Sequence, residues 1–316
     1  MPIFNSNVII KEMRKAKGLT QEQLAEGICS RSTITMIEQG KRKPDWYTFE
    51  SLMNRLGIDA KEYFNDIASE DEVYFYNQLM AFRQLRNLLQ YDKLKLEMEK
   101  IENDPKFKEG LGRRVYRECC RIYYSYGPYK NLELALKYVM EAIKENRPDF
   151  DINEIQNYFL SEKERAIITT LGTIHGELGD LEKSIKIIAK LIKSYEKNYS
   201  TMDEVIRVNY CTQFVNLAAT YAALEQYEKC LEAADKGLAV AQGFDMAINH
   251  YMYSLCNKAY ALISLGRKDE GYLLYKRYFL YIYSLGKEQH PGIDFDMLKQ
   301  EFEKTTGDKL DLSVPW

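Results

Sequence analysis

Apolar residues recur three and four positions apart along most of this chain, as in LEKSIKIIAKLI (181–192). This spacing places them on one face of a helix. Alternating apolar and polar residues flanked by hairpin turns, which are typical of strands, are nearly absent. Gly and Pro punctuate the helical stretches and mark the turns between them. The pattern therefore predicts an all-α protein.

The first 66 residues predict about five short helices. Thr20 is a good N-cap because its hydroxyl can accept a hydrogen bond from a free backbone N–H, and Gln23 stands at the capping-box position. Ser30 is placed to cap the next helix, and Gly40 to end it. Helices this short are not stable alone, so they must pack as one small domain. The expected helices cover residues 6–17, 20–28, 31–39, 48–56 and 60–66.

Residues beyond position 91 show a looser rhythm of helix pairs. Four similar segments place a small side chain at a shared position, with spacings of 49, 46 and 41 residues. These residues are Ala135, Ser184, Cys230 and Gly271. Twelve positions before the last three of these residues stands a second set of small residues: Gly172, Ala218 and Ala259. The corresponding position in the first segment is Tyr123, which breaks the pattern. Paired helices with small residues at two fixed sites indicate an α-solenoid, and the repeat resembles a long, degenerate tetratricopeptide repeat (TPR).

These patterns divide the chain into three parts. Residues 1–66 form the small domain, residues 67–91 a linker helix, and residues 92–316 the repeat domain. Within the last part, we expect a terminal helix over residues 294–305 and a tail at residues 314–316.

Charge and composition exclude little. The 316 residues carry a formal net charge of −3, which argues weakly against nucleic acid. The first 66 residues alone hold 10 basic and 9 acidic side chains, so this part permits DNA contact without showing it. No stretch approaches the length of a membrane span and no signal peptide is evident, which predicts a cytoplasmic protein.

The six cysteines suggest neither a disulfide framework nor a metal site. No CxxC pair occurs, and only three His could join a metal cluster. Most of the cysteines lie in apolar helical runs, so we expect reduced thiols in the core. No GxSxG, HExxH or P-loop pattern occurs either, and we expect neither an enzyme nor a bound cofactor.

The segment from Thr20 to Pro44 strongly resembles the helix-turn-helix (HTH) of the Xre/Cro family. Its inward positions are apolar: Leu24, Ala25, Ile28, Ile34 and Ile37. The turn ICSRS is one residue shorter than the usual Gly-containing turn, as in PlcR-type regulators. Glu38 is better suited to hold a nearby Arg than to read a base. The fold expected is therefore an N-terminal five-helix Xre/Cro-type HTH domain followed by a TPR-like α-solenoid.

This resemblance implies that the third helix enters the major groove of double-stranded DNA. Arg31 can donate two hydrogen bonds to guanine, and the positive end of the second helix suits Gln21 to a phosphate. Met36 stands where the family commonly has Arg, which puts a contact with a thymine methyl in doubt. Taken singly, each of these residues could equally be solvated surface. The predicted DNA-contacting residues are Gln21, Ser30, Arg31, Ser32, Thr35, Met36, Lys41, Arg42 and Lys43.

An HTH domain followed by degenerate repeats resembles the RRNPP quorum-sensing regulators, and most closely their PlcR-like members. The resemblance implies a homodimer whose repeat domain binds a short signalling peptide on its concave face. Asn216 and Asn257 would clamp the peptide backbone, since an amide side chain both donates and accepts hydrogen bonds. Each residue could instead serve only in packing. The predicted peptide-binding residues are Arg83, Arg86, Asn87, Gln90, Thr173, Tyr210, Asn216, Tyr253, Asn257 and Tyr260.

These features favour a sequence-specific transcriptional regulator switched by a short intracellular peptide. The direction of the switch is left open. Two alternatives remain: an HTH repressor whose solenoid binds a protein partner, and a Rap-like protein-binding scaffold.

Overall fold

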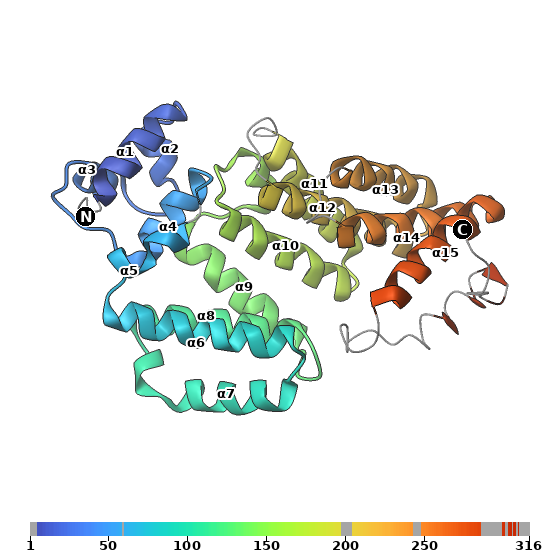
Figure 1. Ribbon diagram of the computed structural model, residues 1–316, viewed down its shortest axis with the longest axis horizontal. Helices are drawn as coiled ribbons and strands as arrows, with labels where there is room; N and C mark the ends of the chain where they lie inside the picture. Colours follow the sequence, from blue (N-terminus) through green and yellow to red (C-terminus); the bar gives the residue numbers. More distant parts are fainter. Residues whose placement is uncertain are drawn as a thin grey trace. The chain divides into compact units, whose positions relative to one another are not determined.

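A computed structural model describes residues 5–58, 60–196, 204–242 and 248–285, together with a few positions between 299 and 309 (Figure 1). Every regular element in these ranges is helical, which confirms the all-α prediction. Contacts along the chain divide it into two units, Met1–Ile174 and His175–Trp316. The expected terminal helix and C-terminal tail lie largely outside the described residues. No helix in the described ranges is long and apolar enough to cross a membrane.

The N-terminal domain has the short helices expected from the sequence. Thr20 and Gln23 form the predicted capping box, and the Ser30 hydroxyl accepts from the backbone N–H of Thr33. The fourth helix begins two residues before the predicted start, because the Asp45 side chain caps it by accepting from the backbone N–H of Thr48. The fifth stretch is divided into a 3-10 turn and one turn of α-helix. The elements are α1 (Ser6–Ala16), α2 (Gln21–Ala25), α3 (Arg31–Glu38), α4 (Trp46–Arg55), η1 (Ala60–Tyr63) and α5 (Phe64–Ile67).

The rest of the first unit is a series of helices that pack on one another. The helix expected as a linker, α6, lies alongside α7 and α8 (Figure 1) and buries Phe75, Leu79 and Phe82. A continuous apolar core therefore runs from Ile10 of the N-terminal domain to Tyr123 of α8. The elements are α6 (Glu70–Asn87), α7 (Tyr91–Asn103), η2 (Pro105–Phe107), α8 (Gly110–Ser125), α9 (Leu132–Asn146), η3 (Ile152–Asn157) and α10 (Glu162–Glu177), which crosses into the second unit.

A network of ion pairs ties the N-terminal domain to the later helices of the first unit. Arg55 at the end of α4 lies 2.9 Å from a carboxylate oxygen of Glu164 in α10. Arg147 lies 2.8 Å from the other oxygen of Glu164 and 2.9 Å from Glu26, which follows α2. The Arg55 side chain is fully buried and also donates to the backbone carbonyl of Leu24. Charges this buried require their partners, so the network holds the domain in one arrangement on these helices.

The second unit consists of helices paired as the repeat pattern predicted. Consecutive helices from α11 to α15 pack on one another, and α12 also lies against α14. The predicted small residues are at the helix crossings: Ala218, Cys230 and Ala259 are fully buried, and a Cβ added to Gly271 would lie 2.7 Å from the carbonyl oxygen of Ala259. The elements are α11 (Leu181–Glu196), α12 (Glu204–Ala223), α13 (Tyr227–Ala241), α14 (Ile248–Ser264) and α15 (Lys268–Leu285).

The cysteines are free thiols, as expected. Burial raises the pKa of Cys120 and of Cys230 to about 11 and that of Cys211 to about 12, so these groups stay protonated at neutral pH. Cys29 and Cys256 are half-buried. In the described part of the chain no group of three or more His, Cys, Asp or Glu could hold a metal ion.

Candidate DNA interface

Helix α3 presents a polar face to solvent and an apolar face to the domain core. Ile34 and Ile37 are fully buried, as the sequence predicted. Arg31 and Ser32, in the first turn, are exposed, and Met36 is 37% exposed one turn later. The exposed side of α3 therefore offers a guanidinium and a hydroxyl in its first turn and a thioether one turn later. This is the arrangement by which a recognition helix reaches base edges.

A buried carboxylate fixes α3 to its neighbours. Glu38 is 6% exposed and accepts two hydrogen bonds from the guanidinium of Arg14 in α1, at 2.6 and 2.9 Å. It also accepts from the side-chain amide of Gln21 at 2.8 Å. Burial alone would raise the pKa of Glu38, but the hydrogen bonds from Arg14 and Gln21 outweigh it and lower that pKa below its ordinary value. The structural role expected for Glu38 is confirmed.

The same network orients two of the predicted DNA-contacting residues. The hydroxyl of Thr35 donates to the side-chain oxygen of Gln21 at 3.0 Å, while the amide nitrogen of Gln21 is directed to Glu38. Ser30 uses its hydroxyl to cap α3. The bond between Thr35 and Gln21 therefore ties the middle of α3 to the start of α2, and Ser30 stabilises the first turn of α3. Any DNA contact they make would be added to that internal role.

The basic loop after α3 is anchored through its backbone. The backbone N–H groups of Lys41 and Arg42 both donate to the carbonyl oxygen of Met36, so the loop folds back on the end of the helix. The side chains of Lys41, Arg42 and Lys43 are exposed. Lys43 donates to the backbone carbonyl of Asp66 at 3.2 Å. The loop thus adds three cations to the domain that presents Arg31, as a phosphate-contacting segment requires.

The predicted peptide-binding residues are distributed over both units. In the first unit, Arg83 pairs with Glu118 at 2.9 Å, and the guanidinium of Arg86 lies 5.0 Å from the ring centroid of Tyr126. Asn87 is the exposed last residue of α6, and Gln90 precedes α7. The Thr173 hydroxyl donates to the carbonyl of Thr170, one turn earlier in α10. The cation of Arg83 is therefore already compensated within the unit.

In the second unit, the candidates lie on the neighbouring helices α12 and α14. The side-chain amide of Asn257 donates to the backbone carbonyl of Val215 at 3.2 Å, which ties α14 to α12. Asn216 is half-buried, and its side-chain amide makes no hydrogen bond to a described residue. Tyr210 is buried against Phe214, whereas Tyr253 is 45% exposed; Tyr260 lies edge-on to Tyr227. Of the two predicted clamp residues, Asn216 is the one whose whole side-chain amide is uncommitted among the described residues.

Sequence reasoning did not identify several residues that fix the N-terminal domain internally or against the later helices of the first unit. Arg14 was not recognised as the partner of Glu38, and nothing was expected of Tyr47 or of the Arg147–Glu164 pair. Arg14 and Glu38 are 24 positions apart. A helical period relates residues only three or four positions apart, so no local signal connects such partners.

Comparisons with known proteins identify the N-terminal domain as a helix-turn-helix domain. The family model described as "Helix-turn-helix" matches residues 10–63. The HTH-type transcriptional regulator YqaF of Bacillus subtilis is 37% identical over 62 residues, which are 19% of this chain and 82% of that protein. An HTH-type transcriptional regulator of Methanothermobacter thermautotrophicus is 38% identical over 65 residues, which are 20% of this chain and 90% of that protein. The chain therefore belongs to the DNA-binding helix-turn-helix transcriptional regulators.

The likeness to a solved structure extends over almost the whole chain. PlcR from Bacillus thuringiensis, solved in complex with the peptide PapR7 and DNA, is 19% identical, with a TM-score of 0.53. The match covers 91% of this chain and 96% of PlcR. The helix-turn-helix domain and the helices that follow it thus share the PlcR fold. The expected order of an HTH domain followed by a helical repeat domain is confirmed at the level of the fold.

Proposed function

We propose that this regulator reads a specific DNA site with α3 and that a short peptide bound to its repeat domain switches this activity. The observation that carries the DNA-reading part is the first turn of α3, where Arg31 and Ser32 are exposed while Ile34 and Ile37 are fully buried. Arg31 makes no ion pair or hydrogen bond through its side chain to any described residue. Its guanidinium is therefore available for a guanine base.

The peptide-sensing part is supported by two observations of different kinds. PlcR, whose fold this chain shares, was solved with a bound peptide and DNA. In this chain, Asn216 offers an uncommitted amide on α12, next to α14, where Asn257 is bonded across the pair. An amide of this kind can bind an extended peptide backbone whatever the side chains of the peptide.

We further propose that the regulator binds DNA as a homodimer. A single α3 contacts few base pairs, and helix-turn-helix proteins gain specificity by placing two recognition helices in successive turns of the major groove. We therefore expect an operator with two related half-sites about 10 base pairs apart from centre to centre.

The proposed DNA reading by α3 can be tested by letting the full chain select its binding site from a library of random DNA duplexes. Fluorescence anisotropy on the selected site would follow, with Arg31→Ala as the test variant. Removing a two-bonded guanine contact costs about 1–3 kcal/mol, and the dimer loses one such contact in each half-site. Arg31→Ala is therefore expected to weaken binding by about thirtyfold or more and to relax selectivity at one base pair in each half-site.

Arg113→Ala is the matched control, because Arg113 is equally exposed but lies on α8, outside the DNA-binding domain. Its affinity is expected to equal that of the wild type. Unchanged binding by Arg31→Ala would refute the assignment of α3 as the reading helix. Selection of a single, unpaired half-site would refute the dimer.

A further inference from the structure

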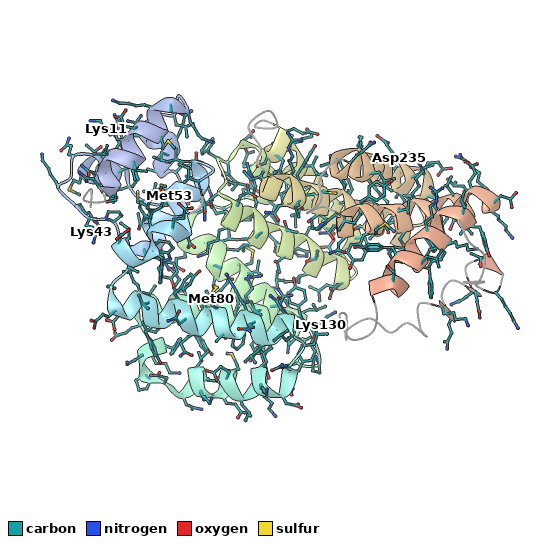
Figure 2. All side chains as sticks on the ribbon, in the orientation of Figure 1. Lys11, Lys43, Met53, Met80, Lys130 and Asp235 are labelled. Atoms are coloured by element: carbon teal, nitrogen blue, oxygen red, sulfur yellow. The ribbon has the colours of Figure 1, made fainter. Side chains whose placement is uncertain are left out.

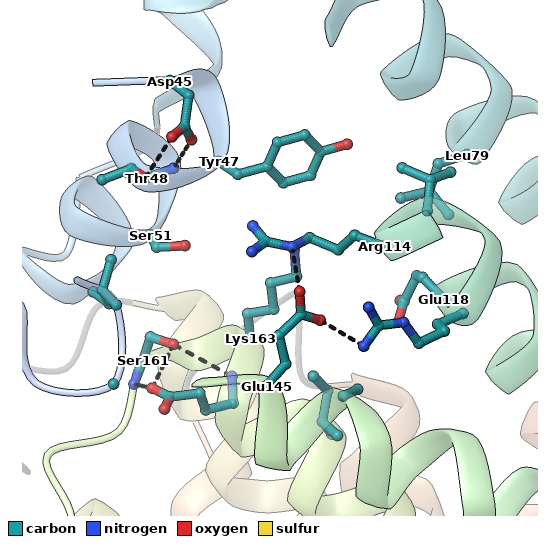
Figure 3. A pocket seen from close by; sticks show the side chains of 17 residues that line it. Asp45, Tyr47, Thr48, Ser51, Leu79, Arg114, Glu118, Glu145, Ser161 and Lys163 are labelled. Carbon is teal, nitrogen blue, oxygen red and sulfur yellow. Dashed lines mark hydrogen bonds and ion pairs between the residues drawn. The ribbon is translucent and has the colours of Figure 1, made fainter. Parts of the chain in front are cut away.

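A cavity lies within the first unit, between α4 of the DNA-binding domain and the helices α8, α9 and α10. Its volume is about 130 Å³. An engineered protein cavity of about 150 Å³ binds benzene, so this one has room for a single small molecule. Tyr47 from α4, Arg114 from α8, Lys163 from α10 and Glu145 from α9 line it, and the Glu145 carboxylate is paired with Arg114 (Figure 3).

The Tyr47 hydroxyl is buried in this wall without a hydrogen-bond partner. The residue is 6% exposed, and its oxygen contacts no donor or acceptor in the described part of the chain. Burying a hydroxyl unpaired is unfavourable, because it loses the hydrogen bonds that water supplied. Burial also raises the pKa of Tyr47, which keeps the hydroxyl protonated and able to donate at neutral pH.

Cations surround the Tyr47 ring. The Lys163 ammonium lies 5.2 Å from the ring centroid, and the Arg114 guanidinium lies 5.9 Å from it. Arg114 and Arg117 share one carboxylate, that of Glu145, at 3.1 and 3.0 Å. The Nε of Arg117 is buried and has no partner among the described residues.

The other carboxylates of the cavity wall are already engaged. Glu118 pairs with Arg83 and Arg121, and Glu164 with Arg55 and Arg147, none of which lines the cavity. Asp45 caps α4.

Lys163 forms no ion pair or hydrogen bond with any described residue. Burial lowers the pKa of Lys163, while the carboxylates of Glu50 and Glu118 act to keep the ammonium charged. The wall therefore has an ammonium with no direct ion pair or hydrogen bond to a described residue beside a hydroxyl with no hydrogen-bond partner among them.

We propose that this cavity binds a small oxyanion, a phosphate or carboxylate group, which accepts a hydrogen bond from Tyr47 and pairs with Lys163 and Arg114. Hydrogen bonds from charged donors to such groups are short and strong. None of the predicted DNA-contacting or peptide-binding residues lines the cavity. Because its walls come from the DNA-binding domain and from α8 to α10, a bound anion would hold these parts together.

Isothermal titration calorimetry of the full chain with inorganic phosphate and, separately, with succinate tests the proposal. Sodium chloride at matched ionic strength serves as the reference. Saturable binding of either anion is expected in the wild type, and the anion that binds assigns the group as phosphate or carboxylate. Tyr47→Phe is expected to weaken binding about tenfold, and Lys163→Met by more than tenfold.

Matched controls come from the same unit. Tyr126→Phe and Lys93→Met alter exposed side chains on other surfaces and are expected to bind like the wild type. Without the anion, Tyr47→Phe is expected to be at least as stable as the wild type to thermal unfolding, because it removes an unpaired buried hydroxyl. The proposal would be overturned by wild-type protein that binds neither anion above the chloride reference, or by wild-type affinity in both variants. Loss of folding in Tyr47→Phe would also overturn it, by showing that the hydroxyl has a structural partner.

Discussion

At the scale of single residues, the buried carboxylate of Glu38 holds the DNA-binding domain together through hydrogen bonds within the domain. Glu38 is bonded to Arg14 of α1 and to Gln21 of α2, and so connects three helices. From the sequence, Glu38 was expected to hold a nearby arginine and not to read a base. The choice of Arg14 as its partner depends on how α1 crosses α3, which no local pattern specifies.

Glu38→Gln is expected to lower the free energy of unfolding by about 2 kcal/mol at pH 7, since it removes the charge from hydrogen bonds donated by a guanidinium. The pKa of Glu38 is lowered in the folded protein, so its charge contributes stability above the unfolded pKa of about 4.3. This contribution is lost as the pH falls through the folded pKa.

Urea denaturation at a series of pH values checks this prediction. The difference between wild type and Glu38→Gln should be greatest near pH 7 and shrink below about pH 4. Glu22→Gln, an exposed glutamate in α2, is the control and should match the wild type throughout. A difference that grows on acidification would contradict the assignment.

At the scale of elements, the sequence predicted correctly those features that depend on residues close together in the chain. The caps at Thr20 and Ser30 and the small residues of the repeats were all predicted, because capping and close helix approach depend on residue type and spacing. The start of α4 at Trp46 was predicted too late, because the role of Asp45 as its cap was not recognised. The ion pair between Arg55 and Glu164 joins residues 109 positions apart, and only the tertiary arrangement brings them together.

Gly271→Ala tests the close approach of α14 and α15. An added Cβ would lie 2.6 Å from Cγ1 of Ile263 and 2.7 Å from the carbonyl oxygen of Ala259, so the helices would have to separate. We expect a net loss of stability of about 1–3 kcal/mol, even though Ala favours a helix over Gly by about 1 kcal/mol.

Chemical denaturation followed by circular dichroism measures this loss. Leu273→Ala in the same helix is the control, because Leu273 is 51% exposed and its change should stay within about 0.5 kcal/mol. Stabilisation by Gly271→Ala would mean that helix propensity, not the crossing, dominates at this position.

At the scale of the whole molecule, the fold agrees with the sequence-based expectation, and the roles of the candidate site residues stay predictions. Helix α3 exposes the residues predicted to read bases, and Gln21 and Thr35 have an internal role that composition could not reveal. The predicted peptide-binding residues lie in both units, and their joint role stays a prediction. Within α12 and α14, however, Asn216 and Asn257 do lie on neighbouring helices, as equivalent positions of adjacent repeats should.

The central claim is that a peptide on the repeat domain changes DNA binding by α3. The most direct measurement is the anisotropy-derived affinity for the selected DNA site, with and without short synthetic peptides that the immobilised full chain retains from a library. The retained peptides are expected to change the DNA affinity of the wild type at least fivefold, a coupling of about 1 kcal/mol.

Asn216→Ala should reduce this change, and Asn77→Ala, an exposed residue of α6, should preserve it. The account would be contradicted if no peptide were retained, or if saturating peptide left the DNA affinity of the wild type unchanged.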